Sequence, residues 1–336
     1  MDVYIVAGSQ AEKRGDNRLY VMKWADMHQT TQEDEECSDS EEEEARHREP
    51  VIRFEAIPNR GGINRVRSMH GTPIVAAWTE EAEVAIFNVA SAIEELDKPV
   101  TTSKQKQPPK KYGGCKIASF KHRQEGYALD WSCNTLGRLA AGSNDASIYI
   151  YKSSDETCSS FVKEFAVGLQ GHKGSVEDIQ WSPSQDHVLA SCSSDRTIKL
   201  WDVRATQLKP VMSWVASDCD INVISWNSAP ETKFLLASGD DKGEIRIWDL
   251  RMLQPFMNKK KADIEPITQI HWHGDAITSI QFEPREESVL AVTSADNRMT
   301  LWDFSVEIDE AEQAMQVNDE LEMQIPPQMM FLHQGQ

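Results

Sequence analysis

Short runs of alternating apolar and polar residues, separated by turn residues, fill most of the chain. The clearest example is the stretch 174–204, where residues 176–181, 188–192 and 197–203 alternate in this way or are rich in Val, Ile, Leu and Trp. Ser-Pro and Ser-Asp pairs separate the three runs. Alternation with a period of two and enrichment in β-branched and aromatic residues are typical of strands. The stretch therefore predicts three consecutive β-strands.

The same kind of run recurs from one end of the chain to the other. Two strands are expected at residues 3–8 and 18–24, and one last strand at 328–335. Between them the pattern predicts five sets of four, at residues 51–89, 115–153, 159–203, 209–250 and 266–304. This gives about twenty-three strands and an all-β chain.

The sets repeat with a measurable period. The last aromatic residue of each fourth strand is Phe87, Tyr151, Trp201, Trp248 or Trp302, at intervals of 64, 50, 47 and 54 residues. The last three intervals fit a repeat of about 40–45 residues with small insertions. Other residues keep fixed offsets from these aromatics, with an acid six residues before and a histidine 29 residues before. The acids are Glu81, Asp145, Asp195 and Asp296, with Asp241 seven residues before Trp248, and the histidines are His122, His172 and His273.

Three short motifs resemble a known fold family. Gly171-His172, Ser193-Ser194-Asp195 and Trp201-Asp202 resemble the WD-repeat β-propeller, and the Trp248-Asp249 and Trp302-Asp303 units agree with it. The resemblance implies radial four-stranded blades, usually seven. The strand count represents about six blades of a seven-bladed ring that is incomplete at its ends. The resemblance also implies a hydrogen-bond chain from His through Ser to Trp, together with the turn Asp, that holds each blade in register.

A second resemblance covers nearly the whole chain and is more specific. Four features carry it: VAGSQAE near the start, a Glu-rich insertion, GHKGSVEDIQWSP and SCSSDRTIKLWD. Together they resemble the glutamate-rich WD-repeat proteins. That family implies a nucleolar chaperone of a basic ribosomal protein in large-subunit assembly, and histone binding. The chain lacks the family's N-terminal extension and last repeat, so we expect a fragment of one propeller domain over residues 1–336.

Catalytic and metal-binding interpretations are weaker than a structural one. His172, Asp195 and a nearby Ser suggest a catalytic triad, but the same offsets recur in several units, and catalytic groups do not normally come in copies. His271 and His273 could form a metal pair, yet His273 is the repeat histidine. No Gly-rich phosphate loop is found. We therefore expect no enzyme activity, no metal and no cofactor.

Composition excludes further classes of function. The chain has 336 residues, is 40% hydrophobic and has a formal net charge of -19, which argues against direct nucleic-acid binding and favours basic partners. No apolar run approaches the roughly 20 residues of a membrane span, and the first residues do not resemble a secretory signal. The six cysteines have no metal-ligand spacing, which favours a reducing compartment.

The acidic insertion at residues 29–48 is the best functional candidate. Nine of the twelve residues 33–44 are acidic, so like-charge repulsion predicts a disordered segment that could hold Lys- and Arg-rich surfaces. These residues are Glu33, Asp34, Glu35, Glu36, Asp39, Glu41, Glu42, Glu43 and Glu44. The alternative is a solubilising loop without a partner. Ser38 and Ser40 each have an acid three residues later and are candidate phosphorylation sites.

Three other segments complete the list of candidates. Residues 306–324 form a second acidic loop, and residues 98–114 form a Lys- and Pro-rich linker. The lysines of that linker (Lys104, Lys106, Lys110, Lys111) and of residues 259–261 are either exposed loop residues or a nuclear-import signal. Arg204 and Arg251 each follow Trp-Asp by two residues, a pattern that marks docking to a cullin ubiquitin-ligase adaptor in some WD-repeat proteins.

The sequence thus predicts a non-enzymatic WD-repeat chaperone or scaffold of ribosome biogenesis in the nucleus and nucleolus. Its partners would be basic proteins, a large-subunit ribosomal protein or histones. Three alternatives stay open: a histone-binding chromatin protein, a substrate receptor of a cullin-RING ligase, and a scaffold whose acidic residues serve only solubility.

Overall fold

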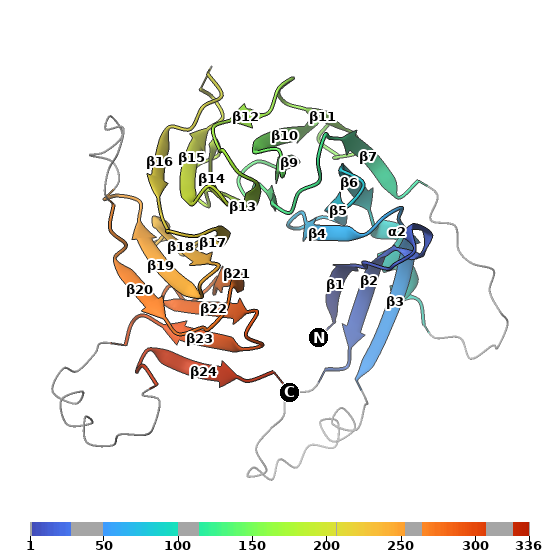
Figure 1. Ribbon diagram of the computed structural model, residues 1–336. Helices are drawn as coiled ribbons and strands as arrows, with labels where there is room; N and C mark the ends of the chain where they lie inside the picture. The colour runs from blue at the N-terminus through green and yellow to red at the C-terminus, as the bar shows by residue number, and fades with distance from the viewer. Residues whose placement is uncertain are drawn as a thin grey trace, which may run out of the picture. The chain divides into compact units, whose positions relative to one another are not determined.

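The computed structural model is built almost entirely of antiparallel β-sheet (Figure 1). It describes residues 2–27, 50–99, 114–205, 207–252, 264–306 and 325–335. These residues form six sheets with 24 strands, in agreement with the expected six blades. Their contacts divide the chain into two compact units: unit 1 is Met1–Glu125 with Thr157–Phe161, and unit 2 is Gly126–Glu156 with Val162–Gln336. The expected single domain stays a prediction.

Unit 1 begins with a three-stranded sheet in the order β1-β2-β3. Its strands are β1 (Val3–Gly8), β2 (Arg18–Ala25) and β3 (Val51–Pro58). We expected β3 to open the set at residues 51–89, and this grouping is wrong, because β3 pairs with β2 over its whole length, from Arg18↔Pro58 to Ala25↔Val51. One face of the sheet buries Leu19, Val21 and Ile57 in a core cluster.

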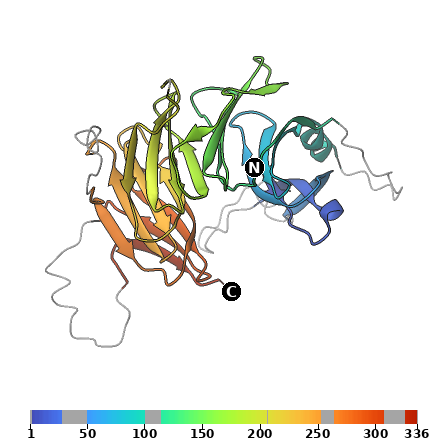
Figure 2. The same ribbon diagram turned by 45° about the horizontal axis from the view of Figure 1, so that its top comes forward.

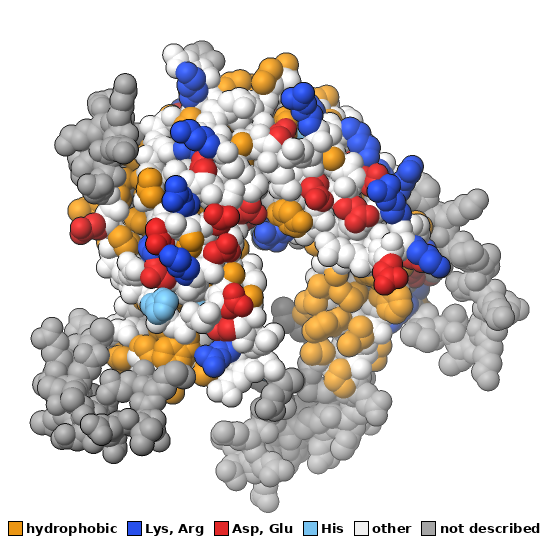
Figure 3. Space-filling model, viewed as in Figure 1, with side chains coloured by type: hydrophobic (Ala, Val, Ile, Leu, Met, Phe, Trp, Pro, Cys, Tyr) orange, Lys and Arg blue, Asp and Glu red, His pale blue; other side chains and the backbone are white. Residues whose placement is uncertain are grey.

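The other face of this sheet is apolar and partly exposed. The register places Val3, Trp24 and Ile52 side by side, and then Ile5, Met22 and Phe54. Because side chains alternate between faces, both rows lie on the face opposite Leu19 and Val21. Ile52 is 61% exposed and Phe54 62%. Figure 3 shows hydrophobic side chains gathered over this sheet. These three strands thus carry large apolar side chains on both faces of their sheet.

The second sheet of unit 1 has the order β4-β5-β6-β7. Its strands are β4 (Ile63–Ser68), β5 (Ile74–Thr79), β6 (Glu83–Asn88) and β7 (Lys116–Lys121). A helix that the sequence patterns did not predict, α2 (Ala90–Asp97), follows β6 and lies against β2 and β3 (Figure 2). It buries Ala92 and Leu96, too few apolar positions to stand out from a loop. The 3-10 turn η1 (Arg14–Asp16) precedes β2.

Unit 2 contains the other four sheets, apart from Phe161 of β11. The first consists of β8 (Leu129–Trp131), β9 (Arg138–Gly142), β10 (Ser147–Ser153), β11 (Phe161–Lys163) and β12 (Leu169–Gln170). The second consists of β13 (Val176–Trp181), β14 (Val188–Ser193), β15 (Thr197–Asp202) and β16 (Met212–Val215). The third consists of β17 (Ile221–Trp226), β18 (Leu235–Asp240), β19 (Glu244–Asp249) and β20 (Thr268–His271). The fourth consists of β21 (Ile277–Phe282), β22 (Val289–Ser294), β23 (Met299–Asp303) and β24 (Met329–His333).

The sequence repeats and the sheets are offset by one strand. The strand that we expected to open the set at residues 209–250 is β16, and β16 pairs with β15 of the preceding sheet. The same holds for β20, which pairs with β19, and the expected isolated last strand is β24, which pairs with β23. The predicted grouping is therefore wrong, although the strands themselves are found. A linear pattern shows where strands lie but not which neighbour each one pairs with.

Neighbouring sheets of unit 2 pack face to face. One core cluster joins Ala140 and Ile148 of the first sheet to Ile179 and Trp201 of the second. Equivalent clusters join the second sheet to the third and the third to the fourth. Each inner sheet thus has both faces covered, which explains why its strands contain long buried runs rather than strict alternation.

A repeated hydrogen bond also connects the first strands of these sheets. Asp130 accepts a bond from the backbone N–H of Trp181 (2.7 Å), and Gln180 accepts one from that of Trp226 (2.6 Å). In the next pair, Ser225 accepts a bond from the backbone N–H of Phe282 (3.0 Å). In each case the acceptor residue directly precedes the aromatic residue that ends the same strand. These bonds satisfy backbone N–H groups on the free edge of each first strand. They also fix how far one sheet is shifted along its strands relative to the next.

Candidate functional site

His172 lies in a buried chain of hydrogen bonds in the sheet β13–β16. The indole Nε1–H of Trp201 donates to Ser191 Oγ (2.8 Å), and Ser191 Oγ lies 2.7 Å from His172 Nε2. His172 Nδ1 lies 3.0 Å from Asp195 Oδ2. Because a carboxylate only accepts, the Nδ1–H of a neutral imidazole donates to Asp195, and Ser191 donates to Nε2. Each polar side-chain atom in this hydrogen-bond network then has a partner.

The environment of this chain keeps His172 neutral. Burial lowers the pKa of His172, and the bond to Asp195 only partly opposes this effect. Burial acts to raise the pKa of Asp195, but hydrogen bonds from His172 and Thr197 hold it well below its usual range. Ser191 is fully buried and already accepts the indole N–H, so its hydroxyl is not presented to a substrate. The geometry is that of a structural network rather than of a nucleophile with its base.

We predict that His172 makes the protein less stable in mild acid. An unfolded chain binds a proton on this imidazole near pH 6.5, whereas the folded protein resists protonation because the pKa is lowered. The free energy of unfolding should therefore fall as the pH drops through about 6.5, by up to about 1.4 kcal/mol per pH unit. Urea unfolding at pH 8.0 and pH 5.5 measures this slope. His172→Gln should flatten it and His333→Gln, at an exposed position, should not; equal slopes in all three proteins would contradict the prediction.

The sheet β21–β24 contains the same hydrogen-bond network, with a threonine hydroxyl in the role of the serine hydroxyl. His273 Nδ1 lies 3.0 Å from Asp296, and its Nε2 lies 3.0 Å from Thr300 Oγ1. Thr300 also accepts the indole N–H of Trp302 (2.8 Å). The position that corresponds to Ser191 is Val292, which has no hydroxyl. A threonine on the neighbouring strand therefore supplies the hydroxyl, and the path from His to Trp is kept.

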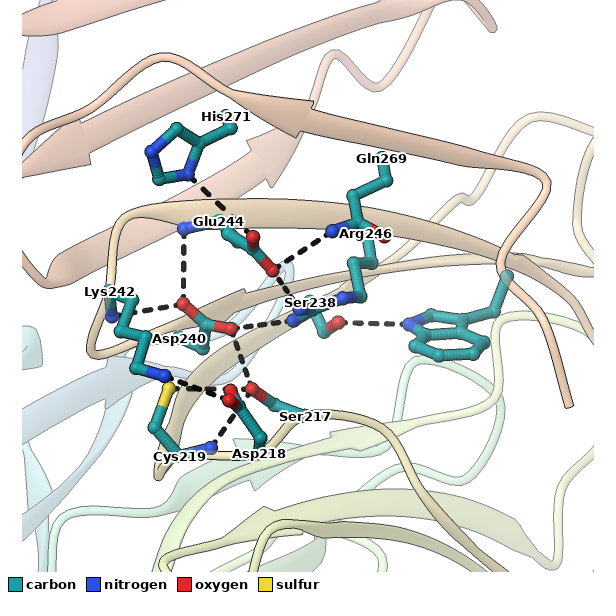
Figure 4. A network of polar contacts seen from close by, with 11 residues as sticks. Ser217, Asp218, Cys219, Ser238, Asp240, Lys242, Glu244, Arg246, Gln269 and His271 are labelled. Carbon is teal, nitrogen blue, oxygen red and sulfur yellow. Dashed lines mark hydrogen bonds and ion pairs between the residues drawn. The ribbon is translucent and has the colours of Figure 1, made fainter. Parts of the chain in front are cut away.

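The sheet β17–β20 has a different network, in which an ion pair replaces the histidine (Figure 4). Trp248 donates to Ser238 Oγ (2.9 Å). Nearby, Asp240 accepts hydrogen bonds from the Ser217 hydroxyl (2.7 Å), from the Arg246 guanidinium and from the backbone N–H of Lys242 (3.0 Å). Asp240 is 1% exposed, so this carboxylate is a buried charge with a paired cation.

The assignment of Asp241 to this network is wrong. The carboxylate of Asp241 accepts a bond from the Asn222 side chain at the surface (2.7 Å), while its neighbour Asp240 takes the buried place. The hairpin is not lengthened, because five residues lie between the paired Gly239 and Ile245, as between Cys192 and Ile198. Gly243, with a φ of 81°, takes the place of Arg196. A fixed offset counted back from Trp248 cannot show which of two adjacent acids points inward.

Three other repeat residues have separate surroundings. In unit 1, the ring of His122 lies edge-on to Trp78, with 5.1 Å between their centroids. In unit 2, Asp145 accepts bonds from the Tyr149 hydroxyl (3.1 Å) and from the backbone N–H of Ser147. Tyr151, at the position of the repeat tryptophans, is fully buried, and burial raises its pKa.

Arg204 and Arg251 lie on one groove between the sheets β13–β16 and β17–β20. The groove has a volume of about 350 Å³, and Asp202, Lys233 and Trp226 also line it. Arg204 pairs with Asp202 through Nε and Nη2 (2.6 Å for the Nη2–Oδ2 contact), and Arg251 pairs with Asp249 in the same way (2.7 Å). These bonds raise the pKa of both guanidiniums, so both are charged. The sequence predicted the two arginines but not the groove that joins them.

The other predicted sites fall largely outside the described residues. This holds for the acidic insertion 29–48 with Ser38 and Ser40, for the four linker lysines, for residues 259–261 and for nearly all of residues 306–324. His271 and His273 have different partners, because His271 lies 3.7 Å from Glu244. Within the described ranges, no cluster of three or more His, Cys, Asp or Glu could hold a metal ion. Nor does any helix there have the length and apolar character that a membrane span requires.

Comparison with known proteins places the chain in a family. The WD domain, G-beta repeat family matches residues 163–202 and 264–303, each from the last strand of one sheet to the third strand of the next. Ribosome assembly protein rrb1 of Schizosaccharomyces pombe is 36% identical over 342 residues, which cover 99% of this chain and 67% of that protein.

Two further relatives match parts of the chain. Protein HEAT STRESS TOLERANT DWD 1 of Arabidopsis thaliana is 33% identical over 293 residues, 85% of this chain and 60% of that protein. Glutamate-rich WD repeat-containing protein 1 of Dictyostelium discoideum is 38% identical over 214 residues, 60% of this chain and 42% of that protein. The chain thus spans between 42% and 67% of the length of these relatives. With its six blades, it belongs to the WD-repeat β-propeller family that includes ribosome assembly protein rrb1 and glutamate-rich WD repeat-containing protein 1.

Proposed function

We propose that the chain is a non-enzymatic scaffold of ribosome assembly that holds a basic protein through residues 33–44. The observation that carries this proposal is the similarity to ribosome assembly protein rrb1 over 99% of the chain. A segment with nine carboxylates among twelve residues adds a strong local negative field. Such a field attracts Lys- and Arg-rich surfaces and competes with nucleic acid for them. The cargo would be a large-subunit ribosomal protein, and the site of action the nucleus and nucleolus.

A variant of constant length tests this function. Changing the nine acids of residues 33–44 to their amides removes the charge and keeps the chain length. We expect at least a tenfold loss of affinity for a purified basic large-subunit ribosomal protein, measured by titration at low salt. Neutralising the acids of residues 307–322 is the matched control and should change the affinity less. An unchanged affinity in the first variant would leave the acidic residues with a solubilising role only.

Histones are the second class of basic cargo. The electrostatic argument is the same for both, so competition separates them: unlabelled core histones are titrated against the bound ribosomal protein. Displacement only at a large excess of histone supports ribosome assembly, and displacement at equal concentration favours the chromatin alternative. Phosphorylation of Ser38 and Ser40 would add about -1.5 to -2 charges each and should strengthen either interaction.

A role as substrate receptor of a cullin ligase is a separate candidate. The observation that favours it is that the arginines of two consecutive Trp-Asp-x-Arg motifs line one groove. Changing Arg204 and Arg251 together to Ala should abolish co-purification with the ligase adaptor and leave the binding of basic cargo intact. Retention of the adaptor by the double variant would contradict this candidate.

A further inference from the structure

The groove that Arg204 and Arg251 share carries a small excess of positive charge, although the chain as a whole has a net charge of -19. Three cations, Arg204, Lys233 and Arg251, line it. Arg204 is paired with Asp202 and Arg251 with Asp249, so Lys233 supplies the excess charge. The lining thus offers positive charge to a ligand in a protein whose other features favour basic partners.

Both guanidiniums are held in place with one edge open. Each uses its Nε–Nη2 edge for its own aspartate, at Asp202 and at Asp249. Arg251 also lies over the ring of Phe234, with 3.4 Å from Cζ to the centroid. The end-on edge, formed by Nη1 and the outer Nη2–H, has no acceptor among the described residues, and it matches a carboxylate in bidentate geometry. The side chains are 66% and 62% exposed, so a ligand can reach both edges.

The floor of the groove is apolar and is packed into the core. Leu200, Met212 and Leu250 line it, and so does Trp226, whose indole N–H donates to the backbone oxygen of Lys233 (2.8 Å). Met212 and Trp226 are 7% exposed and belong to the core cluster between the two sheets. A volume of about 350 Å³ lies at the lower end of the range of about 300–1,000 Å³ that is usual for ligand sites. It accommodates a few side chains rather than a folded domain.

We infer that this groove binds an extended peptide in which a large apolar side chain lies two residues from a carboxylate on either side. In an extended chain successive side chains point to opposite sides, and every second one lies on the same side. In the order Glu-x-Leu-x-Glu both carboxylates and the apolar side chain therefore face the groove, so the carboxylates can meet the open edges of Arg204 and Arg251 while the apolar side chain enters between them. This partner has the opposite charge to the basic cargo, so the groove is a second interaction surface. Its failure would leave the proposed function untouched.

The test is fluorescence anisotropy with a labelled eight-residue peptide that contains the segment Glu-Ser-Leu-Ser-Glu. We expect saturable binding that weakens with salt and at least a tenfold loss of affinity in Arg204→Ala/Arg251→Ala. Arg204→Lys/Arg251→Lys keeps the charge but not the bidentate edge and should also bind less tightly than wild type. Val211→Asp places a like charge on the 37%-exposed rim residue and should weaken binding independently. The matched control Arg60→Ala/Arg285→Ala removes the same charge elsewhere and should bind as wild type does.

Control peptides separate charge from apolar contact. Replacement of Glu by Gln, or of Leu by Ser, should each abolish saturable binding. The inference is overturned if the wild-type protein does not bind the Glu–Leu peptide, or if the Gln peptide binds as tightly. It is also overturned if the double alanine variant loses less than tenfold while its melting temperature matches that of the wild type.

Discussion

Asp240→Ala should lower the free energy of unfolding by about 3–5 kcal/mol, the usual effect of removing one partner of a buried ion pair. Asp240 is 1% exposed and accepts bonds from Ser217, from Arg246 and from two backbone N–H groups. Its removal leaves the Arg246 guanidinium, whose side chain is only 11% exposed, with Glu244 as its remaining partner. Urea denaturation measures the loss.

The adjacent residue gives a closely matched control. Asp241→Ala removes the same charge one position later, where the carboxylate is exposed and accepts a hydrogen bond from the Asn222 side chain. Its effect should stay within about 0.5 kcal/mol. Replacing both members of the pair, as Asp240→Ala/Arg246→Met, should cost less than Asp240→Ala alone, because the buried guanidinium is then removed together with the carboxylate that it pairs with. Equal losses in Asp240→Ala and Asp241→Ala would contradict the assignment of the buried place to Asp240.

Trp201→Ala should destabilise unit 2 by about 3–5 kcal/mol, as large-to-small changes of core aromatics do. Trp201 is 1% exposed, packs in the cluster between the first two sheets of unit 2, and donates the hydrogen bond that begins the chain through Ser191 to His172. The variant therefore leaves a cavity and removes a donor from a buried network.

Trp201→Phe separates these two contributions. It keeps an aromatic ring in the cluster and removes the indole N–H, so its cost should be about 1–3 kcal/mol, from the lost bond and the smaller volume. The difference between the two variants, measured from urea midpoints at constant slope, reports the packing term. If Phe and Ala cost the same, the hydrogen bond rather than the packing holds the sheet.

The sequence predicted the strands well because their signal is local. Residues 3–8 and 51–58 coincide with β1 and β3, and most other expected runs agree within two residues with the strands found. Partner choice, in contrast, depends on which backbone groups meet in space. The pattern could therefore not show that β16 and β20 complete the preceding sheets.

The candidate sites show the same difference between what a local pattern predicts and what depends on contacts in space. His172, Asp195 and Trp201 were found because their spacing recurs, and the structure joins them through Ser191. The role of Asp240 was missed because it lies beside Asp241, which fits the spacing better. Trp226 and Lys233, which line the groove of Arg204 and Arg251, lie in β17 and in the loop after it, and not in the sheet that Arg204 follows. Only the fold brings these residues together.

The central claim, that residues 33–44 hold a basic protein by charge, is tested most directly by the salt dependence of binding. The affinity for a basic large-subunit ribosomal protein is measured over a series of NaCl concentrations, for the wild-type chain and for the variant with nine amides. Salt screens exposed charges, with a Debye length of about 10 Å at 0.1 M, so the wild-type affinity should fall steeply as the salt concentration rises. The amide variant should bind more weakly at low salt and show a much shallower slope. Identical slopes for the two proteins would contradict the account.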